Sequence, residues 1–191
     1  MEGRFRRHVR VLALAAVACA VLAAPAAASH HHAPTPGASE IGDPLFPGLG
    51  NGGYDAIHYS LALRYATADA QQTVSGRVTM FARATQALSR FNLDFAGDSV
   101  DSVTVDGRGA HWTWADGEIA ITPKHSLRDN EKFAVSVSYT ATPFVPTNNV
   151  PFGFFTVNAG SVTAGQPNFS HTFYPVNDHP FDKAYYDLTV T

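Results

Sequence analysis

Three residues near the C-terminus, His171, Asp178 and His179, have side chains that could carry out acid–base chemistry or bind a metal ion. Either use would require Asp178 to face one of the histidines. Asp178 and His179 are adjacent, however, and the side chains of adjacent residues diverge in extended chain. We therefore expect Asp178 to be a carboxylate that accepts local backbone N–H groups and fixes a turn, and the imidazoles to lie on the surface.

The familiar motifs of other enzyme classes do not supply a catalytic centre. The sequence contains no Gly-x-Ser-x-Gly and no Walker loop, and its one cysteine is Cys19. The segment 48–53 spells Gly-x-Gly-x-x-Gly, but Pro47 precedes it and a strand-like segment follows it. A dinucleotide-binding turn needs a strand before it and a helix after it. No catalytic residue is predicted in this chain.

The first 29 residues have the pattern of a secretory signal peptide. Basic residues at 4, 6, 7 and 10 precede an apolar run from Val11 to Ala24, and Pro25 and small residues follow. The run is shorter than the roughly 20 residues that a membrane-spanning helix needs. The pair Arg6-Arg7 would suit twin-arginine export, but Arg10 interrupts the apolar continuation, so Sec export is favoured. The chain is predicted to be secreted.

Composition indicates one domain that does not use disulfides. After the signal peptide, residues 30–44 are rich in Pro, Ala and His and are predicted to be a flexible leader, with the folded domain over 45–191. Cys19 lies in the signal peptide, so the secreted chain must rely on a packed core, for which its length is sufficient. The net charge is −3, and the basic residues of the domain are scattered. Nucleic acid is therefore not expected as a partner.

Alternation of apolar and polar residues predicts β-strands throughout the domain. Tyr59, Leu61 and Leu63 would face one way while Ser60 and Ala62 face the other. The same period recurs at 78–82, 91–95, 103–105 and 133–139, and Asp116-Gly117 is placed to join 112–114 to 119–121 as a hairpin. No segment of the domain holds a 3.6-residue period. The prediction is an all-β fold, an antiparallel, twisted β-sandwich or saddle-like domain.

The order of several short segments resembles one family of enzymes. The segment from Phe173 to Tyr186 resembles the Phe-Pro-x-x-Asp-x-Pro-x-x-Lys-Ala stretch that closes the N-terminal β domain of aminopeptidase N-type zinc metallopeptidases. Residues 54–63 resemble the family's opening strand, and 75–80, 91–95 and 100–107 resemble later strands. The resemblance covers about 140 residues. It implies a substrate-capping domain that precedes a catalytic domain, and it predicts a chain truncated before that domain.

The resemblance assigns roles to five residues. Pro175, Asp178, Pro180 and Lys183 match the closing motif and imply a structural role, while His179 replaces the family's usual Glu. Gln166 matches the position of a Glu or Gln that reaches the active site. In a full enzyme its side-chain oxygen would accept hydrogen bonds from the free α-ammonium group of a peptide. The family usually has a second Gln two residues earlier, where this chain has Ala164.

The zinc-binding and catalytic residues of the resembled family are absent from the sequence. Neither His-Glu-x-x-His nor Gly-x-Met-Glu-Asn occurs between Met1 and Thr191. We expect no metal ligand and no cofactor in this chain, with zinc confined to a catalytic domain that would be its partner. Peptide N-termini would be the substrate of the full enzyme. The chain alone is predicted to be inactive.

The alternative is a standalone secreted β-sandwich binding module for a peptide, a glycan or another protein. An aromatic surface could serve it, although core packing explains most of the same side chains. The aromatic candidates are Trp112, Trp114, Phe152, Phe154 and Phe155.

Overall fold

The computed structural model describes residues 33–65, 73–142, 153–157 and 160–191. The expected signal peptide lies outside the described residues. Within them, no helix is long and apolar enough to cross a membrane. Apart from a single 3-10 turn, η1 (Ser170–Thr172), the regular elements of this part of the chain are strands.

The largest sheet has six strands, in the order β12-β2-β3-β9-β5-β6. Its long strands alternate buried and exposed residues as the sequence predicts: Val78, Met80 and Ala82 are buried, and so is every second residue from Phe133 to Tyr139. The strands are β2 (Tyr54–Tyr65), β3 (Val74–Ala84), β5 (Ser99–Val105), β6 (Arg108–Gly109), β9 (Lys132–Ala141) and β12 (Tyr185–Val190).

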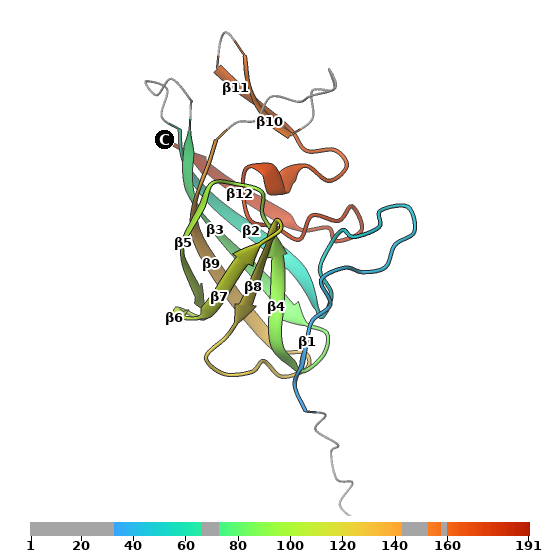
Figure 1. Cartoon of the computed structure of the whole chain (residues 1–191). Helices are drawn as coiled ribbons and strands as arrows, with labels where there is room; N and C mark the ends of the chain where they lie inside the picture. The colour runs from blue at the N-terminus through green and yellow to red at the C-terminus, as the bar shows by residue number, and fades with distance from the viewer. Residues whose placement is uncertain (1–32, 66–72, 143–152, 158–159) are drawn as a thin grey trace, which may run out of the picture. The chain divides into compact units, whose positions relative to one another are not determined.

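A four-stranded sheet, in the order β1-β4-β8-β7, lies over the large one (Figure 1). Its strands are β1 (Thr35–Pro36), β4 (Leu88–Asp94), β7 (His111–Ala115) and β8 (Glu118–Thr122). A separate two-stranded hairpin consists of β10 (Gly153–Val157) and β11 (Gly160–Ala164).

The core fills the space between the two larger sheets. Phe91 on β4 packs against Phe133 on β9, with ring centroids 5.1 Å apart, and Phe95 packs against Tyr139 at the same separation. Aromatic pairs in such tilted and edge-to-face arrangements add about 0.5–1.5 kcal/mol beyond the burial of their area. The all-β sandwich predicted from the sequence is therefore confirmed.

The sheets are mixed, which the sequence analysis did not predict. β12 pairs in parallel with β2, and β1 pairs in parallel with β4. Two parallel strands that pair must be joined by a long crossover connection. Both of these pairs accordingly bring together strands that are distant in the sequence. The pairing of β1 also orders part of the segment expected to be a flexible leader: the Thr35 N–H donates to the Ala87 carbonyl at 2.9 Å and the Gly37 N–H to the Arg90 carbonyl at 2.8 Å.

Aromatic residues that could have formed a binding surface are mostly packed inward. Trp112 and Trp114 share one face of β7, as the alternation predicts, and lie half-buried against the core. The Trp114 indole N–H donates to the Phe95 carbonyl at 3.0 Å. Phe154 is buried, while Phe152 lies outside the described residues. The inward packing of Trp112, Trp114 and Phe154 fits a core role better than an aromatic surface.

The predicted hairpin at Asp116-Gly117 joins β7 to β8. Both turn residues have positive φ, 53° for Asp116 and 82° for Gly117. This left-handed backbone suits the two-residue turns whose twist matches paired strands. Gly is the residue that adopts it without steric cost.

A matched pair of glycine substitutions tests this turn. Gly117→Ala should lower the free energy of unfolding by about 1 kcal/mol, because a Cβ is strained at φ +82° although the space around it is open. Gly109→Ala is the control: it also faces open space and has no positive φ. Urea denaturation of both variants measures the difference, and equal stabilities would contradict the assigned turn.

Candidate functional site: the loop at Gln166 and the segment 174–182

Gln166 lies at the exposed tip of a loop that follows the β10–β11 hairpin. The Gln166–Pro167 peptide bond is cis. The loop is closed by a hydrogen bond from the Phe169 N–H to the Gly165 carbonyl at 3.0 Å. The Gln166 side chain is therefore presented to solvent by a short, hydrogen-bonded turn. A side chain held in this way can meet a ligand that approaches from outside the domain.

The hairpin and η1 hold this loop against the rest of the sandwich. Phe154 on β10 packs on Phe173, with ring centroids 6.1 Å apart. The Tyr65 hydroxyl at the end of β2 lies 2.7 Å from the Ser161 hydroxyl on β11. Within η1, the His171 carbonyl accepts a hydrogen bond from the Ala96 N–H at 2.9 Å. The loop is thus tied to the domain on both sides of Gln166.

The segment 174–182, which contains most of the motif noted in the sequence, connects the two larger sheets. Val176 forms a two-way backbone bridge with Asp94 at the end of β4, with N–O distances of 2.8 and 3.0 Å. The Asn177 N–H donates to the Tyr59 hydroxyl on β2 at 3.0 Å. Asp182 Oδ1 accepts the Ala56 N–H at 3.3 Å. The segment therefore contacts β4 on one side and β2 on the other.

Asn177 is the centre of these contacts, and the sequence analysis did not single it out. Its side-chain oxygen accepts the Asn51 N–H at 2.7 Å, and its amide nitrogen donates to the Asn51 carbonyl at 3.2 Å and to Asp182 Oδ2 at 2.5 Å. The loop that it holds is the one that spells Gly-x-Gly-x-x-Gly. Within that loop, Gly50 has φ +73° and approaches His179 so closely that a Cβ would lie 2.6 Å from the His179 Cβ. These glycines allow close packing against the segment 174–182.

Asp178 and His171 face one another, which the sequence analysis considered and did not favour. Asp178 Oδ2 accepts the His171 backbone N–H at 3.1 Å and lies 2.5 Å from His171 Nδ1. Burial lowers the pKa of His171, but the hydrogen bond and the charge of Asp178 outweigh it, so the pKa is raised overall. Asp178 therefore binds a backbone N–H seven residues before it in the sequence, and it also orients an imidazole. The extended-chain argument concerned the adjacent residues Asp178 and His179, whose side chains do have different partners, and it did not cover His171, which lies in η1.

His179 is buried, so the expectation of a surface imidazole is wrong for this residue. The Phe181 N–H donates to His179 Nδ1 at 3.1 Å. On the other side of the ring, Nε2 lies 3.4 Å from Asp43 Oδ2 without a hydrogen bond. His179 thus accepts a hydrogen bond within the turn at Pro180 and packs close to Asp43.

His171 lines a cavity of about 270 Å³, together with Ala96, Thr142, Phe169 and Thr172. A carboxylate that orients a histidine can activate a nucleophile when a hydroxyl faces the ring. The Thr172 hydroxyl instead donates to the Phe169 carbonyl at 2.7 Å. The pair therefore fits a structural role, in which it fastens η1 to the segment 174–182.

The other motif residues differ in exposure. Pro175 is buried within the segment 174–182, whereas Pro180 and Lys183 are exposed. Within the described ranges, no group of three or more His, Cys, Asp or Glu side chains is arranged to hold a metal ion. The residues present here therefore do not fit a zinc site.

Two neighbouring carboxyl groups lie where β4 and β8 pair, that of Asp94 buried and that of Glu118 half-buried. Asp94 and Asn92, which lie between the apolar residues of 91–95, are both buried, and Asp94 accepts hydrogen bonds from the loop at Asn51 and from the segment 174–182. Glu118 lies directly opposite Asp94 across the β4–β8 pair. Burial, and then the neighbouring Asp94 carboxyl, raise the pKa of Glu118 to about 9. Burial also raises the pKa of Asp94.

Solved structures that match this chain include zinc metallopeptidases. A mutant M1 zinc metallopeptidase from Deinococcus radiodurans bound to a Tyr-Ser-Ala substrate matches with 30% identity and a TM-score of 0.67, over 74% of this chain and 33% of that chain. A two-domain M1 zinc metallopeptidase mutant bound to L-arginine matches with 30% identity and a TM-score of 0.65, over the same shares. An M1 zinc metallopeptidase from Deinococcus radiodurans gives the same values as this second structure.

The chain thus spans about a third of the length of these structures. No family model matches the sequence, and none of the curated proteins matches it. Over most of its length, the β-sandwich described above is similar in structure to part of the M1 zinc metallopeptidases.

The bond between the Asn177 N–H and the Tyr59 hydroxyl can be tested by removing one oxygen atom. Tyr59→Phe should lower the free energy of unfolding by about 1–3 kcal/mol, because a buried backbone N–H loses its acceptor. Tyr185→Phe is the matched control, since the Tyr185 side chain is 80% exposed, and it should change stability by less than about 0.5 kcal/mol. Urea denaturation gives both values, and equal values would contradict the assigned bond.

Glu118 should make stability depend on pH. A carboxyl whose pKa is higher in the folded state than in the unfolded state stabilises the fold below its ordinary value, here 4.5, and the contribution is lost as the pH rises towards 9. His171 acts in the same direction, because its folded pKa is also raised. The free energy of unfolding should therefore fall between pH 5 and pH 9.

Glu118→Gln tests the origin of this pH dependence. Gln imitates the protonated carboxyl, so at pH 8 the variant should be more stable by ~1 kcal/mol, a value reduced for the partial exposure of Glu118. Its stability should also vary less with pH. The exposed Asp129→Asn serves as the control and should keep the original profile. A Glu118→Gln profile parallel to that of the unmodified chain would refute the assignment.

Proposed function

We propose that this chain is the N-terminal β domain of a secreted, aminopeptidase N-type zinc metallopeptidase. The observation that carries the proposal is the match of 74% of the chain to M1 zinc metallopeptidases at 30% identity, over only 33% of their length. The order of motifs in the sequence points to the same domain. In this role the domain caps the active site formed by a catalytic domain and does not hydrolyse peptides itself.

Exposed apolar side chains on and beside β12 support a missing partner domain. Phe181 is 83% exposed, Tyr185 80% and Leu188 61%. β12 is also the outermost strand of its sheet, so one edge of it has no partner strand among the described residues. Exposed apolar edge strands favour association and are usually covered. A catalytic domain packed on this edge would bury these side chains.

Gln166 would provide the contact with substrate. Its exposed position on a hydrogen-bonded loop suits a side chain that reaches into a neighbouring domain. The amide oxygen would accept a hydrogen bond from the α-ammonium group, which distinguishes a free peptide N-terminus from an internal residue. The zinc ion and the general base would come from the catalytic domain, because this sequence has no His-Glu-x-x-His.

A chimeric enzyme tests the proposal. The chain would replace the matching N-terminal third of the Deinococcus radiodurans metallopeptidase, and release of amino acids from aminoacyl p-nitroanilides would be measured with and without a chelator. The chimera should show chelator-sensitive activity, and the chain alone should show none. A folded, zinc-loaded chimera without activity would count against the proposal, as would chelator-sensitive hydrolysis by the chain alone.

Gln166 variants of the chimera test the substrate contact. Gln166→Ala should raise KM by about 10-fold, because a hydrogen bond to a charged group is lost. Gln166→Glu should keep or lower KM, because a carboxylate binds the ammonium group more strongly than an amide does. Gln86→Ala is the control, as the Gln86 amide contacts Thr35 and Pro36 instead. An unchanged KM in Gln166→Ala would exclude this role.

A further inference from the structure

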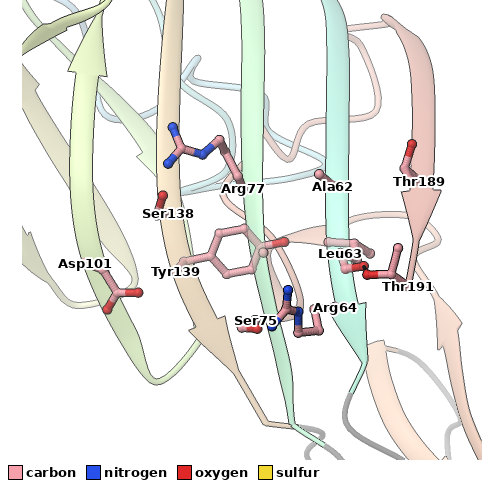
Figure 2. A pocket seen from close by; sticks show the side chains of 11 residues that line it. Ala62, Leu63, Arg64, Ser75, Arg77, Asp101, Ser138, Tyr139, Thr189 and Thr191 are labelled. Carbon is pink, nitrogen blue, oxygen red and sulfur yellow. Dashed lines mark hydrogen bonds between the residues drawn. The ribbon is translucent and has the colours of Figure 1, made fainter.

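The outward face of the six-stranded sheet carries a hollow of about 340 Å³, separate from the loop at Gln166 (Figure 2). Side chains from β12, β2, β3, β9 and β5 line it. Arg64 and Ser75 lie at one end, while Arg77 and Ser138 lie at the other. The lining combines cationic groups, hydroxyl groups and one carboxylate, that of Asp101.

The strand register explains why the hollow exists. Ala62 on β2 lies directly between Arg77 on β3 and Thr189 on β12. Its methyl group is too short to fill the space that the longer neighbouring side chains surround. Arg64 lies two residues further along the same face of β2 and is opposite Ser75. The floor of the hollow is therefore small and apolar, and its walls are polar.

The two arginines make the hollow attractive to an anion. Arg64 and Arg77 occupy diagonal positions on neighbouring strands, which brings two positive charges onto one patch of the sheet. Both are exposed, and neither belongs to an ion pair in the part of the chain that the structure describes. Guanidinium groups bind carboxylate and sulfate oxygens in bidentate geometry. Because the two guanidinium groups lie at opposite ends of the hollow (Figure 2), each can bind a different group of one ligand.

Asp101 and the hydroxyl groups narrow the class of ligand. Asp101 accepts a hydrogen bond from the Ser99 hydroxyl at 3.0 Å through Oδ1, and it lines the hollow opposite the β12 side. A carboxylate repels a bare anion but accepts hydrogen bonds from the hydroxyl groups of a sugar. Ser75 and Ser138 can donate and accept in the same way. The volume lies near the lower end of the range of small-molecule sites.

We propose that this hollow binds an acidic sugar, a monosaccharide unit that carries a carboxylate or a sulfate group. One of the two arginines binds the oxyanion at its end of the hollow, the other donates to sugar hydroxyls at the opposite end, and Asp101 with the neighbouring hydroxyls completes the contacts to the sugar. This site goes beyond the proposed capping function and does not depend on it.

Calorimetric titration of the chain at fixed ionic strength tests the proposal. The probes are glucuronic acid, glucose 6-sulfate, glucose and sodium sulfate. At least one of the two acidic sugars should bind 10-fold or more tightly than both glucose and inorganic sulfate, because only an acidic sugar engages both kinds of group. The preference between carboxylate and sulfate identifies which acidic sugar the hollow takes. If neither glucuronic acid nor glucose 6-sulfate binds more tightly than sodium sulfate, the assignment to an acidic sugar is overturned.

Substitutions locate the binding in the hollow. Arg64→Gln and Arg77→Gln should each weaken binding of the acidic sugar by about 10-fold, which is the loss of one charged contact. Ala62→Gln keeps the charge and fills the hollow, and it should weaken binding as much. Arg83→Gln on the same strand as Arg77 is the control, since Arg83 donates to the Asn130 carbonyl and does not line the hollow.

Melting temperatures of the four variants check that each is folded, and binding is compared only among folded variants. Arg64 and Arg77 are exposed, so their substitution should leave the melting temperature unchanged. Loss of binding in Arg83→Gln equal to that in Arg77→Gln would overturn the proposal, because it would show a general charge effect. So would unchanged binding in both Arg64→Gln and Ala62→Gln.

Discussion

The fold depends on the requirement that buried polar groups find partners. Solvent would satisfy Asp94, at the end of β4, if the strand were open on that face, but Asp94 is buried and the segment 174–182 bonds to it instead. Asp94 then accepts from Asn51 and from the backbone of Asp178 while its own backbone pairs with Val176. Leaving such groups unpaired would cost about 1–3 kcal/mol each. The segment and the loop at Asn51 are thus fixed by the same carboxylate.

The domain presents two kinds of surface, an apolar edge at β12 and a polar outward face of the large sheet. The interior between the sheets is closed by aromatic packing, whereas β12 exposes apolar side chains on both of its faces. The large sheet turns hydroxyl and guanidinium groups outward over several strands. The apolar edge suits a permanent protein neighbour, and the polar face suits a soluble ligand.

Much of the fold was predictable from residue patterns, because alternation and turn chemistry are local. Local sequence patterns alone are sufficient to predict which residues of β3 and β9 are buried, and to predict the hairpin at Asp116-Gly117. The parallel pairing of β12 with β2 was not predictable, since no local pattern encodes a partner strand so distant in the sequence. Asn177 was missed for the same reason: its partners Asn51 and Tyr59 are far from it in the sequence. For Gln166, the sequence supplied the resemblance, and the structure adds its exposure and its loop.

The long sequence separation of these contacts has a consequence for the order of folding. The hydrogen bonds from Asn177 to Asn51 and Tyr59 join residues 126 and 118 positions apart, and the His58–Asp187 contact spans 129. Contacts of this kind form late and slow the folding of β proteins. The chain must lose the conformational entropy of a large loop before the contact can form and stabilise the fold. During synthesis, β2 and the end of β4 therefore remain without their final neighbours until residues 174–190 have left the ribosome. Until then the nascent domain exposes an incomplete sheet edge, which is the state most open to aggregation and to binding by chaperones.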